Sequence, residues 1–303
     1  MTEKLFDLVG LGECLIEFAQ DDIGDYRQGF AGDVFNTLFY GSRLGLKTGF
    51  ITSIGTDDFT PSLLKFMEQE MIDHQLCPRS LQKQNGLYFI SHSDPNNPQY
   101  SFWRNDSAAR SMLKNISIEW LRSYIASSRY FHFSAIALAI LEQRNSLIEL
   151  LRSLEGETHI SFDTNYRQGL WENDDALRDF INTANDFIDV LFVSKEDDAM
   201  LYGSREAEEA VNFYAQLGYR TIIFRQGGDD VLCYNEGVIN RVTVAKDITV
   251  IDATGAGDSF NAGFLAAKLI NRTALECVSA GNNCAAYVIQ HRGGIAQDFN
   301  LTI

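Results

Sequence analysis

The sequence predicts an α/β fold, in which a mostly parallel sheet is covered by helices on both faces and carries a small β appendage. Three observations predict it. Apolar runs of strand length alternate with segments of helical periodicity along most of the chain. Polar residues stand directly after several predicted strands, and two regions break the alternation with hairpin patterns.

The alternation defines the predicted sheet and its cover. Strands are expected at residues 5–11, 48–54, 130–133, 159–162, 190–193 and 221–224. Helices are expected at residues 34–44, 61–71, 118–127, 142–154, 175–185 and 259–270. Strands that alternate with helices in this way pair in parallel and need helices on both faces.

Three polar residues mark one edge of this sheet. Asp163, Ser194 and Arg225 each follow a predicted strand. Because ligands of parallel sheets bind at the carboxyl ends of the strands, the loops that carry these residues are expected to meet at one site.

Two regions depart from the alternation and read as hairpins, at residues 15–30 and 86–104. In the second, residues 86–93 and 99–103 flank the turn 94–98, whose sequence is DPNNP. The alternation and the two hairpin regions together predict one α/β domain over residues 1–303, with a small lid inserted at about 13–30 and 86–106. The alternative is a pair of surface hairpins without a function.

The composition indicates a folded protein and excludes some partners. Of 303 residues, 45% are hydrophobic and 22% are charged, and there are four prolines. The net charge of −16 argues against nucleic acid or an anionic membrane as a partner, since both need a basic face. The exposed strands of a lid could pair between two copies, so a homo-oligomer is expected.

The cysteines and the first residues indicate the compartment. Five cysteines show no metal-binding spacing, so buried free thiols are expected. Residues 1–12 lack the pattern of a secretory signal and read as a first strand. No apolar run approaches the roughly 20 residues needed to span a bilayer. We expect a reducing, cytoplasmic setting.

The segment 252–264, DATGAGDSFNAGF, is the most informative part of the chain. Gly255 and Gly257 let backbone amides approach an anion, and the helix that follows directs its positive end toward the same place. Asp258 stands where a carboxylate could accept the proton of an attacking alcohol. The segment therefore indicates phosphoryl transfer to a hydroxyl group. The alternative is a glycine-rich turn that serves only close helix packing.

Other segments add candidate substrate contacts. Gly32 in the segment FAGDVFNT permits close approach of the backbone, with Asp33 as an expected N-cap. Tyr88 and Arg104 lie in the second lid hairpin. Arg167 follows a predicted strand and could bridge substrate and phosphate. Arginine suits a carboxylate, whereas a neutral sugar needs only hydroxyl partners.

These segments resemble the ribokinase-like (PfkB) carbohydrate kinases, which implies a three-layer sandwich with a β-sheet lid. The resemblance rests on residues 12–17, the Gly32 turn, the Tyr88 and Arg104 hairpin, the segment NYR at 165–167, and the Asp258 segment. It implies Asp258 as catalytic base and the amides of Gly255, Ala256 and Gly257 as an anion hole. It also implies Gly32 and Asn36 as sugar contacts.

The resemblance further implies ATP and Mg²⁺ as cofactors. Its nucleotide contacts are carried over to Asn165, Arg167, Ser194, Arg225, Gly227, Gly255, Gly257 and Asn283. The residue that organises magnesium through water corresponds to Asp197, with Glu196 as the alternative. Ser194 fits equally well as a helix N-cap. A monovalent cation near Asp252 is a further implication.

Within the family, the segments resemble the 2-keto-3-deoxygluconate kinases more than the fructokinases and ribokinases. The implied reaction is ATP-dependent phosphorylation of 2-keto-3-deoxygluconate on O6. A kinase for a neutral sugar, either a fructokinase or a ribokinase, remains an alternative. A second alternative is a catalytically silent sugar-binding regulator that kept the fold.

Overall fold

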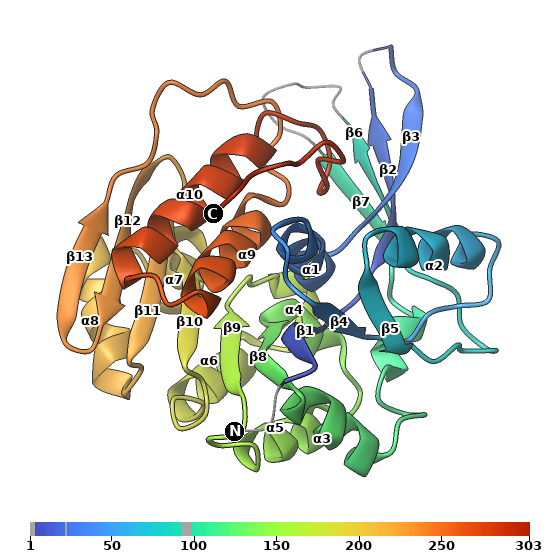
Figure 1. The fold of residues 1–303 in the computed structure, drawn as a ribbon, viewed down its shortest axis with the longest axis horizontal. Helices are drawn as coiled ribbons and strands as arrows, with labels where there is room; N and C mark the ends of the chain where they lie inside the picture. The colour runs from blue at the N-terminus through green and yellow to red at the C-terminus, as the bar shows by residue number, and fades with distance from the viewer. Residues whose placement is uncertain (1–3, 22, 92–98) are drawn as a thin grey trace.

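A nine-stranded sheet forms the centre of the computed structural model, which describes residues 4–21, 23–91 and 99–303 (Figure 1). Its strand order is β13-β12-β11-β10-β9-β8-β1-β4-β5. In this order, the strands β11, β10, β9, β8, β1, β4 and β5 pair in parallel with their neighbours. Strands β12 and β13 extend the edge at β11 by antiparallel pairing. The bounds are β1 (Phe6–Leu11), β4 (Thr48–Ile51), β5 (Ile72–Leu76), β8 (Ser128–Ser134), β9 (His159–Asp163), β10 (Val190–Ser194), β11 (Thr221–Gln226), β12 (Asp229–Asn235) and β13 (Val238–Val242).

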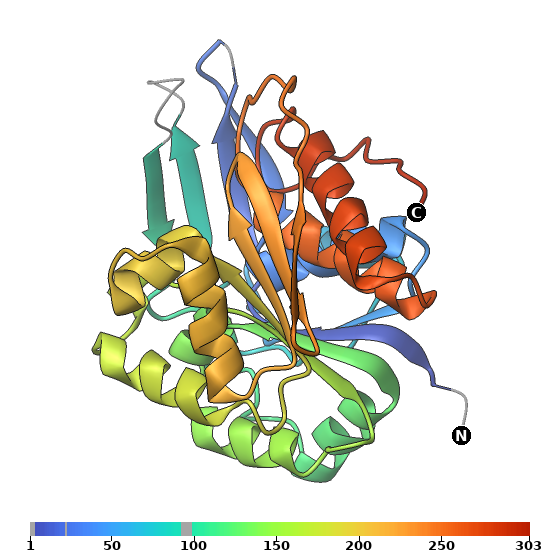
Figure 2. The same ribbon diagram turned by 90° about the vertical axis from the view of Figure 1, so that its left-hand side faces the viewer.

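Helices cover both faces of the sheet, as Figure 2 shows, which confirms the predicted three layers. Neighbouring strand residues pack on opposite faces: Leu8 joins one buried cluster and Val9 the other. One face carries α1 (Asp33–Arg43), α2 (Thr60–Gln69), α9 (Ala256–Leu269) and α10 (Ala274–Val288). The other carries α3 (Ile118–Ala126), α4 (Ala135–Ile140), α5 (Arg144–Arg152), α6 (Asp174–Thr183), α7 (Lys195–Tyr202) and α8 (Ala207–Leu217). Short 3₁₀ turns lie at Ala108–Ser111 and Gln168–Leu170.

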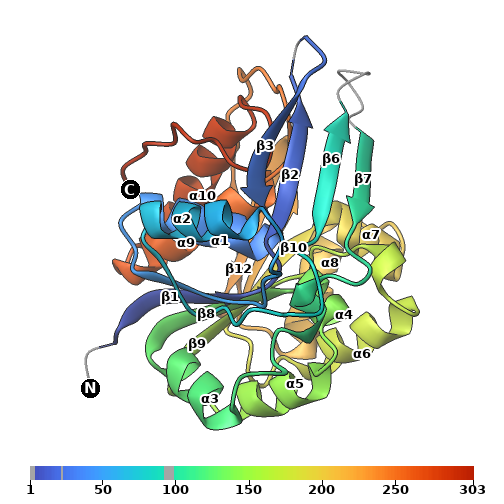
Figure 3. The ribbon, with the colours of Figure 1, turned by 90° about the vertical axis from the view of Figure 1, so that its right-hand side faces the viewer.

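A separate four-stranded sheet projects beside the ends of the central strands (Figure 3). Its order is β3-β2-β6-β7, with bounds β2 (Leu15–Gln20), β3 (Tyr26–Ala31), β6 (Leu87–Ser91) and β7 (Gln99–Trp103). Each predicted hairpin forms an antiparallel pair, and β2 joins the two pairs by pairing in parallel with β6. The predicted turn at 94–98 lies outside the described residues. We call this sheet the lid.

The predicted strands and helices all occur, with ends that are unchanged or shifted by up to three residues. Sequence patterns missed β5, β12 and β13, and they also missed the helices α4 and α8. They also placed the N-cap of α1 at Asp33, which is wrong: Gly32 occupies that position and Asp33 is the first helical residue. The backbone at Gly32 is still extended, with φ 176° and ψ 148°, so helical geometry begins only at Asp33. Glycine is needed at position 32, because a Cβ atom there would lie 2.0 Å from the carbonyl oxygen of Glu13.

Serine residues at strand ends help turn the chain into the next helix. Ser134 ends β8 and caps α4 by accepting a hydrogen bond from the Ala137 amide at 3.1 Å. Ser194 ends β10 and caps α7 by accepting from the Asp197 amide at 3.0 Å. Such caps satisfy amides that the helix itself leaves without partners, so these helices begin directly at the edge of the sheet.

All five cysteines are buried free thiols, as predicted. Among the helices of residues 4–21, 23–91 and 99–303, none has the length and apolar character needed to cross a bilayer.

The close approach of α1 to β1 depends on Gly10, which predicts the effect of a methyl group there. A Cβ atom on Gly10 would lie 2.6 Å from Cγ1 of Val34. Gly10→Ala is therefore expected to lower the free energy of unfolding by about 1–3 kcal/mol, because overpacking displaces the helix. The measurement is urea denaturation.

Gly41 provides the matched control within α1. A Cβ atom on Gly41 would meet its nearest neighbour at 3.5 Å, an ordinary contact. Gly41→Ala should leave stability unchanged or raise it, since alanine favours the helical backbone. Equal effects of the two substitutions would contradict the packing argument.

Candidate active site

A cleft of about 970 Å³ lies between the lid and the ends of the central strands. This volume lies near the upper end of the range of ligand pockets, which is about 300–1,000 Å³. Segments from the whole chain line it, including Glu13, the start of α1, lid strands β6 and β7, the residues after β9, β10 and β11, and the start of α9. The predicted meeting of strand ends at one site is thus observed.

The first turn of α9 forms the chemical centre of this cleft. Gly255 is the N-cap with φ 79°, a conformation that favours glycine. A Cβ atom there would also lie 2.5 Å from the carbonyl oxygen of Gly294. Residues at the start of α9 line the cleft, so the positive end of this helix opens into it. The Ala256 amide donates to the Ala253 carbonyl at 3.2 Å, a long bond that an anion could replace.

Asp258 lies in this first turn with its carboxyl group at the cleft. The Asn36 amide nitrogen donates to its Oδ2 atom at 2.8 Å, and the Thr37 hydroxyl donates to its backbone carbonyl at 3.1 Å. Desolvation, together with the charges of Asp33 and Asp163, holds the pKa of Asp258 well above the usual value of 3.8, although Asn36 and Arg225 oppose the shift. A carboxyl group with a raised pKa suits proton transfer.

Asn36 is already bound on both ends of its side chain. Its Oδ1 atom accepts from the Gly32 amide at 3.2 Å while its nitrogen holds Asp258. Asp33, at the start of the same helix, accepts from the Asn165 side chain at 3.1 Å. The start of α1 therefore orients the carboxyl group on α9, a link that sequence patterns did not reveal.

Arg104 forms a buried ion pair with Glu13 at the lid side of the cleft. Their Nη2 and Oε2 atoms are 2.5 Å apart, and the side chains are 9% and 2% exposed. Burial raises the pKa of Glu13, although the charge of Arg104 opposes the shift. Tyr88 lies nearby, stacked on Phe102 and donating its hydroxyl to Glu17. Glu13 belongs to the segment 12–17 that carries the family resemblance, and its place just after β1 also indicates a site residue.

The other two arginines of the cleft differ in their exposure and in the number of their hydrogen-bond partners. Arg167 is exposed and donates to the Tyr166 carbonyl at 2.8 Å. Arg225 is partly buried and bonds to Asp163 at 2.7 Å, to the Gly257 carbonyl at 3.0 Å and to the Asn261 side chain at 3.1 Å. Asn261 in turn donates to Asp163 at 2.6 Å. Arg225 therefore joins β9 and β11 to the first turn of α9.

The opposite end of the cleft is more apolar. Its lining includes Gly227, at φ 59°, and the apolar side chains Val231, Val244, Ile248, Ala285, Ala286 and Ile289. Ser194 lines the cleft and also caps α7, so its side chain already has a structural role. Asn165 lines the same cleft and donates to Asp33 at 3.1 Å.

Asp197 and Glu196 both line the cleft but in different surroundings. Glu196 is exposed, whereas Asp197 is 4% exposed and accepts from the Thr164 hydroxyl at 2.8 Å. Burial and the charge of Asp163 raise the pKa of Asp197. Within the described ranges, no three side chains of histidine, cysteine, aspartate or glutamate gather as a metal site.

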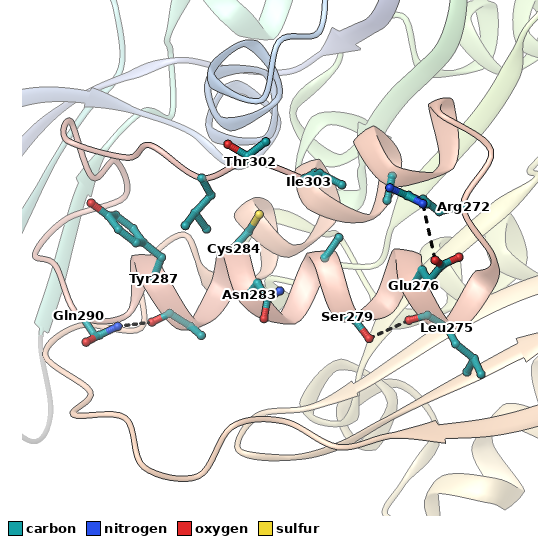
Figure 4. Close-up of a pocket in the computed structure, with 14 residues that line it drawn as sticks. Arg272, Leu275, Glu276, Ser279, Asn283, Cys284, Tyr287, Gln290, Thr302 and Ile303 are labelled. Atoms are coloured by element: carbon teal, nitrogen blue, oxygen red, sulfur yellow. Dashed lines mark hydrogen bonds and ion pairs between the residues drawn. The ribbon is translucent and has the colours of Figure 1, made fainter.

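The prediction for Asn283 is not supported by its position. It lines a second pocket, on the outer side of α10, together with Cys284, Tyr287 and the C-terminal residues (Figure 4). Asn282, Ala285 and Ile289 occupy the cleft side of the same helix instead. A shift of one residue turns a side chain by about 100° around a helix of 3.6 residues per turn.

Asp252 holds the loop before α9. Its carboxylate accepts from the amide and the hydroxyl of Thr254, at 2.9 and 2.6 Å, and from the Gly293 amide at 2.9 Å. It is 3% exposed. These bonds give Asp252 a structural role, and the monovalent cation expected near it stays a prediction.

Comparisons with known proteins agree with this architecture. The model of the pfkB family carbohydrate kinases matches residues 6–299. The 2-dehydro-3-deoxygluconokinase of Dickeya dadantii is 32% identical over 306 residues, which is 97% of each protein. The protein of the same name from Escherichia coli K12 is 31% identical over 296 residues, 94% of this chain and 95% of the relative.

A solved structure shows the same fold over nearly the whole chain. The PfkB protein from Polaromonas sp. JS666 matches with a TM-score of 0.81 and 26% identity, covering 94% of this chain and 96% of that protein. Because the family match spans both the lid and the segment around Asp258, the chain belongs to the pfkB family of carbohydrate kinases.

Proposed function

We propose that this carbohydrate kinase transfers the γ-phosphoryl group of ATP to O6 of a sugar acid, and that its substrate is 2-keto-3-deoxygluconate. One observation carries the proposal. The Asp258 carboxyl group and the start of α9 share a cleft with Arg104 and Arg167. The two relatives named 2-dehydro-3-deoxygluconokinase, after a synonym of the same compound, support the sugar acid.

Asp258 acts as the general base in this proposal. Its carboxylate takes the proton from the primary alcohol as the alcohol oxygen bonds to the γ-phosphorus and the bond to the leaving ADP breaks. Asn36 keeps the carboxylate in place at 2.8 Å. The amides of Gly255, Ala256 and Gly257, at the positive end of α9, stabilise the charge that spreads over the transferred oxygens.

The charge of the cleft explains the need for a divalent cation. Six carboxylic acids line it, namely Glu13, Asp33, Asp163, Glu196, Asp197 and Asp258, against the three arginines Arg104, Arg167 and Arg225. Asp197 or Glu196 fits Mg²⁺ through water, because Mg²⁺ keeps several waters and takes few protein ligands. When bound, Mg²⁺ would neutralise phosphate charge.

Two arginines with different surroundings suit the two ends of the sugar acid. Arg104 is fixed by Glu13, so it presents its remaining N–H groups in one orientation. Arg167 is exposed in the cleft and supplies a positive charge for the carboxylate or the phosphate. Gly32, Asn36 and Tyr88 complete the proposed sugar site.

The nucleotide is proposed to extend from Asp258 toward the apolar end of the cleft. Asn165, Arg167, Ser194 and Gly227 line the path, and Arg225 holds the first turn of α9 beneath it. Asn282, Ala285, Ala286 and Ile289 replace Asn283 as the proposed base contacts on α10.

The alternatives give different outcomes in the same assay. A fructokinase or ribokinase would prefer a neutral sugar, and a silent regulator would consume no ATP with any sugar. The intact first turn of α9 with Asp258 favours an active enzyme, and the pair Arg104 and Arg167 favours an acid.

Asp258→Asn tests the base. Turnover is expected to fall by roughly two orders of magnitude or more, because the amide cannot accept the proton. Binding of ATP, measured by calorimetry, should change little, because the amide has almost the same shape. Turnover near that of the native enzyme would reject the assignment.

The same variant should be more stable near neutral pH. The pKa of Asp258 is raised in the folded state, so ionisation of this group above its usual value of 3.8 costs stability. Asparagine removes that cost. The gain in melting temperature should disappear as the pH falls below that value, where Asp258 is protonated in both folded and unfolded chains.

A substrate panel tests the sugar acid. With MgATP, kcat/KM on 2-keto-3-deoxygluconate should exceed kcat/KM on fructose and ribose, and Arg167→Gln should reduce this preference by about tenfold or more through the lost charge-assisted bonds. Arg220→Gln, outside the cleft lining, is the control. A preference for a neutral sugar would overturn this substrate assignment.

We propose that two copies associate through their lids in the cytoplasm. On β7 and β3 the edge strands expose Trp103 and Tyr26, at 60% and 44%. These two rings pack against Phe89 in edge-to-face contacts, so the apolar surface is continuous. Five free thiols fit a reducing compartment.

Sedimentation equilibrium tests the lid interface. The native protein should have the mass of a dimer, and Trp103→Glu should reduce the mass to that of one chain. An unchanged mass would contradict the lid interface.

A further inference from the structure

The turn at Gly293 and Gly294 contacts the lid, the start of α9 and the residue that holds Asp258. A Cβ atom on Gly294 would lie 2.9 Å from Cβ of Ala31 at the end of β3, and 3.0 Å from the Asn36 side-chain nitrogen. The Gly294 carbonyl accepts from the buried Tyr40 hydroxyl at 2.9 Å. This turn is therefore packed between three parts of the site.

Glu17 of the lid holds this turn from one side. It lies in the middle of β2 and is 6% exposed. Its Oε2 atom accepts from the Gly294 amide at 3.0 Å and from the Tyr88 hydroxyl of the neighbouring strand β6. A Cβ atom on Gly293 would lie 2.5 Å from its Oε1 atom, so the carboxylate rests directly against the turn.

The anion hole lies against the other side of the turn. A Cβ atom on Gly255 would lie 2.5 Å from the carbonyl oxygen of Gly294, so the turn packs directly against the N-cap of α9. The Gly293 amide donates to Asp252, which also accepts from the amide and hydroxyl of Thr254. The residues just before and at the start of α9 are thus supported by the same turn that Glu17 holds.

A second contact closes this arrangement into a ring. Tyr100 of lid strand β7 shares a hydrogen bond with the Thr254 hydroxyl at 2.8 Å. One path runs from the lid through Glu17, the turn and Asp252 to Thr254, and the other returns from Thr254 to the lid. The lid and the loop before α9 are therefore linked at two points.

We propose that Glu17 is a positioning residue that couples closure of the lid to the geometry of the anion hole. Glu17 does not line the cleft, so it acts through Gly294 and Gly255 rather than by touching a substrate. When the lid moves away, the turn loses the acceptor for the Gly294 amide and Gly255 loses its support. Productive placement of the amides at 255–257 then requires a closed lid, which ties transfer to sugar binding. The inference rests on the proposed phosphoryl transfer.

Kinetics of Glu17→Ala and Glu17→Gln test the coupling. At saturating sugar acid, Glu17→Ala should lower kcat by about tenfold or more while the KM for ATP changes by less than about threefold, because a disturbed anion hole weakens the transition state rather than ground-state binding. Glu17→Gln keeps an oxygen that can accept from the Gly294 amide, so it should recover most of the lost kcat.

Glu70→Ala is the matched control. Glu70 is a buried carboxylate held by Arg43 at 2.5 and 2.7 Å, away from the cleft lining. Its loss should lower the melting temperature and leave kcat near that of the native enzyme. If Glu17 had a purely structural role, Glu17→Ala would behave like Glu70→Ala and retain its kcat at saturating substrate. That result would overturn the proposal.

Hydrogen exchange of the Thr254 amide reads the coupling without turnover. This amide is two links from Glu17, through the turn and Asp252, so its exchange should accelerate in Glu17→Ala and stay at the native rate in Glu70→Ala. Unchanged exchange of Thr254 in Glu17→Ala would also overturn the coupling. A native enzyme that phosphorylates no sugar acid would refute the proposed function, while the exchange result would still decide the coupling.

Discussion

The close contact between Gly255 and Gly294 is the constraint on which the site depends. With 2.5 Å between the carbonyl oxygen of Gly294 and any Cβ atom at 255, two stretches of backbone meet directly. This contact fixes where α9 begins, and α9 then fixes Asp258 in its first turn. The position of the Asp258 carboxyl group and the direction of the helix end both follow from it.

Paired charges let an acidic protein bind anionic compounds. The chain carries a net charge of −16, and the cleft itself holds more carboxyl groups than arginines. Arg104 and Arg225 are each matched by a buried partner, Glu13 and Asp163, at 2.5 and 2.7 Å. A buried charge without a partner would be strongly destabilising, whereas a buried ion pair adds little net stability. These two arginines therefore serve mainly as hydrogen-bond donors in fixed positions. Arg167 keeps the exposed charge.

Sequence patterns predicted the layers, the lid hairpins and the Asp258 segment because these depend on local periodicity and glycine spacing. They missed β5, where only Ile72 and Leu76 are buried among polar residues, and the edge strands β12 and β13. Asn283, which the resemblance assigned to the nucleotide, lines a different pocket, because the rotation of a helix face is set by tertiary packing. The roles of Glu13 and Glu17 depend on partners far away in the sequence, such as Gly294, and no local pattern encodes these contacts.

The division of the cleft between two sheets has a consequence for how specificity can change. Asn36 and Asp258 come from α1 and α9, which pack on each other over the large sheet, whereas Tyr88 and Arg104 come from the smaller sheet and its border. With the roles proposed above, replacement of Tyr88 or Arg104 would change which sugar is accepted, while the hydrogen bond from Asn36 to Asp258 stays intact. New substrate preferences could thus arise in descendants of this enzyme without rebuilding its chemistry.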